Sequence, residues 1–198
     1  MINMQKSQEI TDIVHSSIAY SGIEHAVIST PIYNRLHRIL QSSLVYLTYP
    51  SNKVKRFEHS LGVMHLAGKI FFNSICNSTP EVSSDLMNAV SNELVNWRNS
   101  LDFNKYSFIS AELRGKFRKE DILKAPVPMS NFYNKFHPGN LSDDYKFAYF
   151  VTLQAVRLAG LLHDVGHLPY SHILEHALKN MYITISKKES VSRQLWRL

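Results

Sequence analysis

The stretch RLAGLLHDVGHLPYSHILEHAL, residues 157–178, holds four of the ten histidines of the chain. Its apolar first part has helical spacing, and Gly166 and Pro169 predict that the helix ends just beyond His163. His163 and Asp164 are adjacent and offer one imidazole and one carboxylate, a mixed pair that suits a divalent first-row metal. The stretch therefore predicts a buried helix that ends at a candidate metal site.

Two other chemistries fit the histidines and glycines of the chain poorly. His172 and His176 lie four residues apart, but Ile173 stands where a metalloprotease helix needs a glutamate. The segment Gly62–Lys69 resembles a phosphate-binding loop, yet five residues separate its glycines and Ile70 replaces the required hydroxyl side chain. We therefore exclude a metalloprotease and a P-loop.

The rest of the sequence also has mainly the spacing of apolar residues that is typical of helices. Apolar residues recur at helical spacing in several segments, which predicts helices over about 31–43, from near His59 to Ile75, over 81–97, from Tyr145 to His163, and over 171–180. Residues 12–30 are rich in β-branched side chains around Ser21-Gly22, which predicts a short hairpin or loose strands. The expected fold is mainly α with a short β element near the N-terminus.

Composition limits the class of protein. The chain has 198 residues, 44% of them hydrophobic and 19% charged, which suits a single globular domain with or without an insertion. The net charge of +6 favours anionic ligands, and the single cysteine, Cys76, favours a reducing compartment. No secretory signal is visible, and Arg157 interrupts the most apolar stretch, Phe147–Leu162, so we expect a cytoplasmic protein outside membranes.

Three ordered motifs give the chain a specific resemblance. TPIYNRLHRILQSS at 30–43, YPSNKVKRFEHSLGVMHLAGKI at 49–70 and the stretch at 157–178 together resemble the HD-domain phosphohydrolases. Within that superfamily they are similar to the deoxynucleoside triphosphate triphosphohydrolase branch. The resemblance implies an HD-type helical bundle with an N-terminal part at 1–76, an insertion at about 77–144, motif helices at 145–180 and a tail at 181–198.

The resemblance also implies a metal centre. Its ligands would be His59, in the motif RFEHS, together with His163 and Asp164. The metal would be a divalent ion, and manganese, iron, zinc, nickel and magnesium all remain open because histidine and aspartate together suit each of them to some degree. Such an ion can activate water and polarise a phosphoryl oxygen near neutral pH.

Further site residues follow from the same resemblance. His167, His172 and Glu175 would be catalytic, with the histidines moving protons to and from the reacting oxygens. Arg56 would bind the nucleotide, since a guanidinium grips phosphate oxygens in a forked geometry, and Gln41 would face the sugar. The implied substrate is a deoxynucleoside triphosphate, which would be split into a deoxynucleoside and triphosphate.

Alternatives remain open at this point. No aspartate follows Asp164, although the resembling enzymes complete the metal site with a downstream aspartate. We therefore expect a truncated chain, with replacement by Glu175, Glu189 or water as the alternative. The other candidate functions are an HD phosphodiesterase or phosphatase on other nucleotides, and a catalytically incomplete module that binds nucleotides or nucleic acid. A homo-oligomer is also implied by the resemblance.

Overall fold

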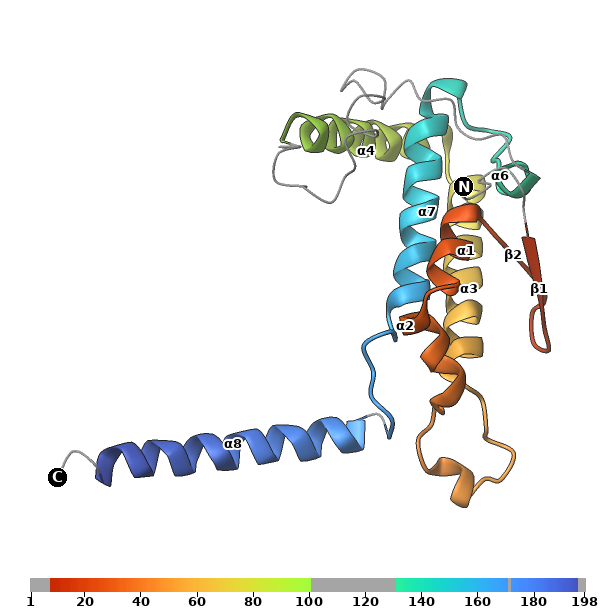
Figure 1. The fold of residues 1–198 in the computed structure, drawn as a ribbon. Helices are drawn as coiled ribbons and strands as arrows, with labels where there is room; N and C mark the ends of the chain where they lie inside the picture. Colours follow the sequence, from red (N-terminus) through yellow and green to blue (C-terminus); the bar gives the residue numbers. More distant parts are fainter. Residues whose placement is uncertain (1–7, 101–130, 171, 196–198) are drawn as a thin grey trace.

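The computed structural model describes residues 8–100, 131–170 and 172–195, and they are mainly helical, as the sequence predicts. A two-stranded antiparallel sheet, β1 (Gln8–Asp12) and β2 (Ser16–Tyr20), lies near the N-terminus (Figure 1). The helices of eight or more residues are α3 (Arg56–Asn77), α4 (Pro80–Ser100), α7 (Lys146–Leu162) and α8 (His172–Leu195). Shorter helices are α1 (Gly22–Ile28), α2 (Pro31–Asn34) and α6 (Asn131–Lys135).

The N-terminal hairpin is real, but its turn lies earlier than the sequence indicates. Asp12 makes the turn, because its Oδ2 accepts hydrogen bonds from the backbone N–H groups of Val14 and His15 at 3.0 and 2.8 Å. Ser21, expected at the turn, instead caps α1 in a capping box with Glu24. A serine followed three residues later by a glutamate is the usual start of a helix, so this cap was readable from the sequence.

The helix expected over 31–43 is much shorter. Thr30 and Pro31 start it as predicted, but α2 ends at Asn34 and a 3-10 turn continues it to Arg38. Ile39 is extended, and its carbonyl accepts the N–H of Arg56 at 2.9 Å, while Leu40 pairs with Lys55 in an isolated bridge. Pairing with the segment before α3 thus ends the helical conformation.

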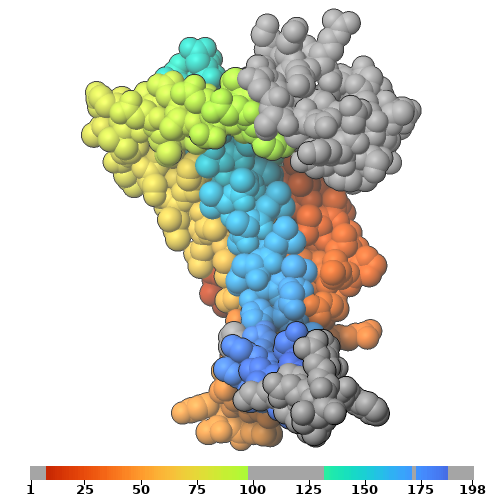
Figure 2. Space-filling view, turned by 90° about the vertical axis from the view of Figure 1, so that its left-hand side faces the viewer, coloured from red at the N-terminus to blue at the C-terminus, as the bar shows by residue number. Residues whose placement is uncertain are grey.

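Two long helices form the centre of the molecule. α3 and α7 run side by side, and Figure 2 shows α7 down the middle of one face, with α3 and the N-terminal segments on either side. One apolar cluster packs α7 against α4 and α6, and a second packs the start of α3 against the hairpin and α1. Gly160 lets the helices approach closely, because a Cβ there would lie 3.1 Å from the Cα of Met64.

The remaining helices extend beyond this pair. α4 is longer than the 81–97 expected, and residues 114–124, a charged stretch of the expected insertion, lie outside the described residues. α8 is also longer than expected and projects away from the bundle (Figure 1), with exposed apolar side chains such as Ile173, Met181 and Tyr182. Within the described residues, no helix combines the length and the apolar character that a membrane crossing needs.

A buried ion pair ties α7 to the N-terminal segments. The side chains of Arg157 and Glu24 are both fully buried, and Arg157 donates from Nε and Nη2 to the two carboxylate oxygens of Glu24 at 2.7 and 2.9 Å. Arg157 also donates to the carbonyl of Ala19 at 2.8 Å, and Gln154 donates to Glu24 at 2.9 Å. Each charge meets its partner and further hydrogen bonds, which offset part of the cost of burying the pair, although Nη1 of Arg157 is buried without a hydrogen-bond partner among the described residues.

Gly68 makes room for this pair and provides a test of it. A Cβ at Gly68 would lie 2.9 Å from Cγ of Arg157, which cannot move without breaking its bonds to Glu24. We expect Gly68→Ala to lower the unfolding free energy by about 1–2 kcal/mol in urea titrations, because overpacking outweighs the better helix propensity of alanine. Gly139→Ala is the control, since a Cβ there meets nothing within 4 Å. Equal stability of the two variants would contradict the tight fit.

Candidate metal centre

The structure brings the three expected ligands together. His59 lies in the first turn of α3, while His163 and Asp164 follow directly on α7. One ligand atom from each of the three lies within 4.8 Å of the others, although 104 positions separate His59 from His163 in the sequence. Asp164 is buried, whereas the imidazoles of His59 and His163 are more accessible. The cluster is therefore open to solvent on the side of its two histidines.

Local hydrogen bonds orient the ring of His163. Its Nδ1 lies 2.7 Å from the carbonyl oxygen of Gly160, in the last turn of α7. A carbonyl can only accept, so Nδ1 carries the proton and Nε2 of the neutral ring keeps its lone pair. That Nε2 lies 3.4 Å from Oδ1 of Asp164. The backbone therefore fixes the tautomer that a metal ligand requires.

The surroundings favour the neutral form of His59. Partial burial lowers the pKa of His59, and the nearby His163 and Arg56 lower it further, while Asp164 acts in the opposite direction. The rings of His59 and His163 have their centroids 5.3 Å apart, and Nε2 of His59 lies 3.7 Å from Oδ2 of Asp164. Two imidazoles beside one carboxylate form a donor set that fits a divalent transition metal.

Arg56, which the resemblance assigns to the nucleotide, contacts the carboxylate of Asp164 in the structure. It is only 2% exposed, and its Nη1 lies 2.5 Å from Oδ2 of Asp164. The arginine thus supplies a positive charge to an aspartate that is itself only 5% exposed. A contact of Arg56 with substrate stays a prediction, and the contact described here makes it a positioning residue for Asp164.

His167 and Glu175 form a second polar pair beside the cluster. Nδ1 of His167 lies 2.7 Å from Oε1 of Glu175, and its Nε2 lies 3.4 Å from Oδ1 of Asp164. Because a carboxylate accepts the Nδ1 proton, Nε2 is the nitrogen left to face Asp164. His167 and Glu175 therefore lie next to the candidate metal ligands.

The remaining two expected site residues, Gln41 and His172, have no described contact with the cluster. Gln41 lies beside Val54, whose carbonyl accepts the Gln41 N–H at 2.9 Å. Its Oε1 is buried without a hydrogen-bond partner among the described residues, and no described contact joins Gln41 to the cluster. His172 begins α8, and its side chain lies outside the described part of the chain. Roles for both stay predictions.

Arg35 is a residue of the site that the sequence reasoning missed. Its Nη2 donates to the carbonyl of His167 at 3.0 Å and also to the carbonyl of Val165, so it holds the turn after Asp164 from outside. No local signal identifies such a residue, because both bonds reach the backbone some 130 positions away. Its place inside the motif at 30–43 was the only hint.

Two mammalian proteins are similar to this chain over most of its length. The deoxynucleoside triphosphate triphosphohydrolase SAMHD1 of Bos taurus is 39% identical over 166 residues, which are 84% of this chain and 17% of that protein. SAMHD1 of Mus musculus is 35% identical over 164 residues, 83% of this chain and 15% of that protein. The chain thus spans less than a fifth of the length of these curated relatives.

Other comparisons are narrower. An uncharacterized protein of Methanocaldococcus jannaschii is 44% identical over 61 residues, 31% of this chain and 14% of that protein. A hypothetical protein from Aquifex aeolicus, known as a crystal structure, has 20% identity and a TM-score of 0.32 over 81% of this chain and 47% of its own. No protein-family model matches the sequence.

The pairing of Arg56 with Asp164 can be tested through stability. We expect Arg56→Met to lower the unfolding free energy by about 3 kcal/mol at pH 7, because it leaves a buried carboxylate without its cation. Urea titration measures the change. Arg38→Met, at an exposed position of the 3-10 turn, is the matched control and should change stability by less than about 0.5 kcal/mol. A similarly small effect of Arg56→Met would show that the pair does not contribute to the stability of the fold.

Proposed function

We propose that this chain carries the metal centre of an HD-type phosphohydrolase that splits deoxynucleoside triphosphates into a deoxynucleoside and triphosphate. The observation that carries the proposal is the meeting of His59, His163 and Asp164 within 4.8 Å of one another. The same three residues are the ligands that the sequence motifs imply. The similarity to two mammalian triphosphohydrolases over more than four fifths of the chain supports the choice of substrate.

The donor set is suited to hold a divalent ion, and each residue has a distinct part in it. In the neutral ring of His163 the bond of Nδ1 to Gly160 leaves the lone pair on Nε2, and burial lowers the pKa of His59, which favours the form that can donate a lone pair. Asp164 adds one negative charge. An ion bound there would polarise a phosphoryl oxygen and make water a better nucleophile.

Arg56 would hold Asp164 in place. It binds Oδ2 of the carboxylate, while Oδ1 is directed toward His163 and His167, at 3.4 Å from each Nε2. The arginine therefore fixes which carboxylate oxygen faces His163 and His167, while Nε2 of His59 lies 3.7 Å from the other oxygen. A permanent positive charge at this depth also attracts the anionic triphosphate toward the centre.

His167 is placed to move a proton. Glu175 accepts the proton on Nδ1 and so stabilises the imidazolium that forms when Nε2 takes up a second proton. A histidine held in this way can give that proton to the oxygen that leaves phosphorus. In this proposal His167 is the general acid and Glu175 its positioning residue, and His172 and Gln41 keep the roles that the resemblance implies.

Product analysis tests the proposed reaction. Purified protein is incubated with the four deoxynucleoside and four ribonucleoside triphosphates and manganese, and products are separated by anion-exchange chromatography. We expect deoxynucleoside and triphosphate, with at least about a hundred-fold lower rate in His163→Ala/Asp164→Ala, because the loss of an acid–base or metal group has this scale. His176→Ala, on the exposed side of α8, is the control and should keep the wild-type rate.

Other outcomes decide against the proposal. Release of a nucleoside monophosphate or diphosphate would indicate another phosphohydrolase reaction, and turnover that survives the double substitution would place the chemistry elsewhere. Nucleotide binding without turnover would favour the catalytically incomplete module.

Metal binding gives a readout that does not depend on turnover. We expect manganese to raise the thermal unfolding midpoint of the wild-type chain in a concentration-dependent way, because an ion that binds only the folded state stabilises it by mass action. His163→Ala should abolish most of this rise, whereas His176→Ala should retain it. A rise of equal size in both variants would show that the ion binds outside the candidate centre.

A further inference from the structure

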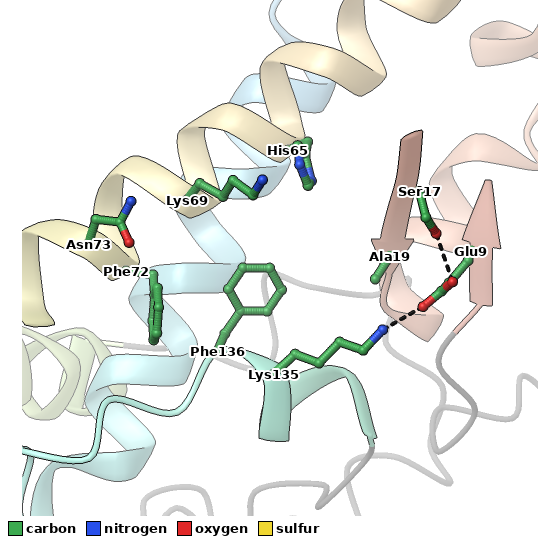
Figure 3. A pocket seen from close by; sticks show the side chains of 9 residues that line it. All are labelled: Glu9, Ser17, Ala19, His65, Lys69, Phe72, Asn73, Lys135 and Phe136. Atoms are coloured by element: carbon green, nitrogen blue, oxygen red, sulfur yellow. Dashed lines mark hydrogen bonds and ion pairs between the residues drawn. The ribbon is translucent and has the colours of Figure 1, made fainter. Parts of the chain in front are cut away.

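A cavity of about 520 Å³ lies on another side of α3, away from the candidate metal ligands. Figure 3 shows it between the hairpin, α3 and the end of α6. Residues from all three elements line it: Glu9, Ser17, Ala19, His65, Lys69, Phe72, Asn73, Lys135 and Phe136. His65 follows His59 by six positions, which places it about 9 Å further along the helix and about 120° around it. The cavity is therefore separate from the metal centre.

His65 is the unusual residue in this cavity. It is only 6% exposed, and neither of its ring nitrogens has a hydrogen-bond partner among the described residues. Its ring contacts that of His15, but their centroids are 5.4 Å apart in a tilted arrangement that makes no hydrogen bond. A buried polar group without a hydrogen-bond partner destabilises the folded state, and a bound molecule can supply the missing partner. Burial, with the nearby Lys69 and Arg157, lowers the pKa of His65 to about 4, so the neutral ring offers one donor and one acceptor.

The charge at the mouth of the cavity is positive. Lys69 lies one helical turn after His65, on the same face of α3, and is exposed without an ion pair among the described residues. Lys135 is already neutralised, because its Nζ lies 2.5 Å from Oε1 of Glu9. One positive charge thus remains uncompensated beside the buried imidazole.

The walls of the cavity are aromatic. Phe72 and Phe136 meet edge to face, with centroids 6.0 Å apart and planes at 88°. Asn73, one turn beyond Lys69, adds an exposed amide at the rim. A cavity with aromatic walls and a few convergent polar groups is typical of a site for a small organic molecule.

We propose that this cavity binds a small organic anion that consists of a flat apolar ring and one acidic group. Lys69 would bind the acidic group, His65 would form hydrogen bonds with its oxygens, and the ring would lie against Phe72 and Phe136. The negative charge of the ligand matches the one uncompensated lysine. This site goes beyond the proposed hydrolysis, because it needs neither the metal nor turnover.

NMR titration with benzoate as the probe tests the proposal. Benzoate, acetate and benzyl alcohol are each added to the full chain at pH 7 and about 0.15 M salt, where weak surface attraction is screened. We expect benzoate to shift the Hε1 resonance of His65 and to bind more tightly than the other two, since acetate lacks the ring and benzyl alcohol lacks the charge. The Kd from the titration is the measured quantity.

Two variants locate the binding. Lys69→Gln should weaken benzoate about ten-fold, the scale of a lost charge-assisted hydrogen bond, while Lys179→Gln on the exposed part of α8 should not change the Kd. Phe72→Leu should reduce the preference for benzoate over acetate about three-fold. The proposal is overturned if benzoate leaves His65 unshifted, if acetate binds equally well, or if both lysine variants weaken binding to the same extent.

Discussion

The bond between Glu24 and Arg157 is the constraint on which the rest of the molecule depends. It places a full positive charge inside the bundle, where the rings of Phe132 and Phe136 also lie 4.8 and 5.4 Å from its guanidinium carbon. A buried charge of this kind is stable only while its partner stays in reach. The pair therefore fixes α7 against α1 and the hairpin, and it forces α3 to pass Arg157 with a glycine at the point of contact.

The candidate metal centre is a consequence of that arrangement. Two glycines, Gly68 and Gly160, sit at successive contacts between α3 and α7 and hold the helices close along their length. The closeness carries the start of α3 to the end of α7, where His59 meets His163 and Asp164. No ligand needs an unusual backbone conformation, since His163 still has helical dihedral angles. The site thus arises from helix packing more than from loop structure.

The three predicted metal ligands lie together in the structure, whereas several predictions about the segments around them were wrong. His163 and Asp164 stand out locally as adjacent ligand types at the end of an apolar helix, whereas His59 was implied only by the resemblance of the motif RFEHS. The position of the hairpin turn was missed, because β-branched residues mark strands without marking register. The helix over 31–43 was overextended, since pairing of Leu40 with Lys55 overrides helical spacing there. The pairing of Arg56 with Asp164 depends on a contact 108 positions away, which periodicity cannot reveal.

The distance along the chain between α3 and α7 bears on how the protein is made. α3 ends at Asn77 and α7 begins at Lys146. The roughly 70 residues between them take about 4–14 s to synthesise at 5–20 residues per second. During that interval α7 has not yet been synthesised, so the apolar face of α3 cannot pack against it. Glu24 likewise has no Arg157 with which to pair. The contacts of α3 with α7 can therefore form only after translation has passed residue 157.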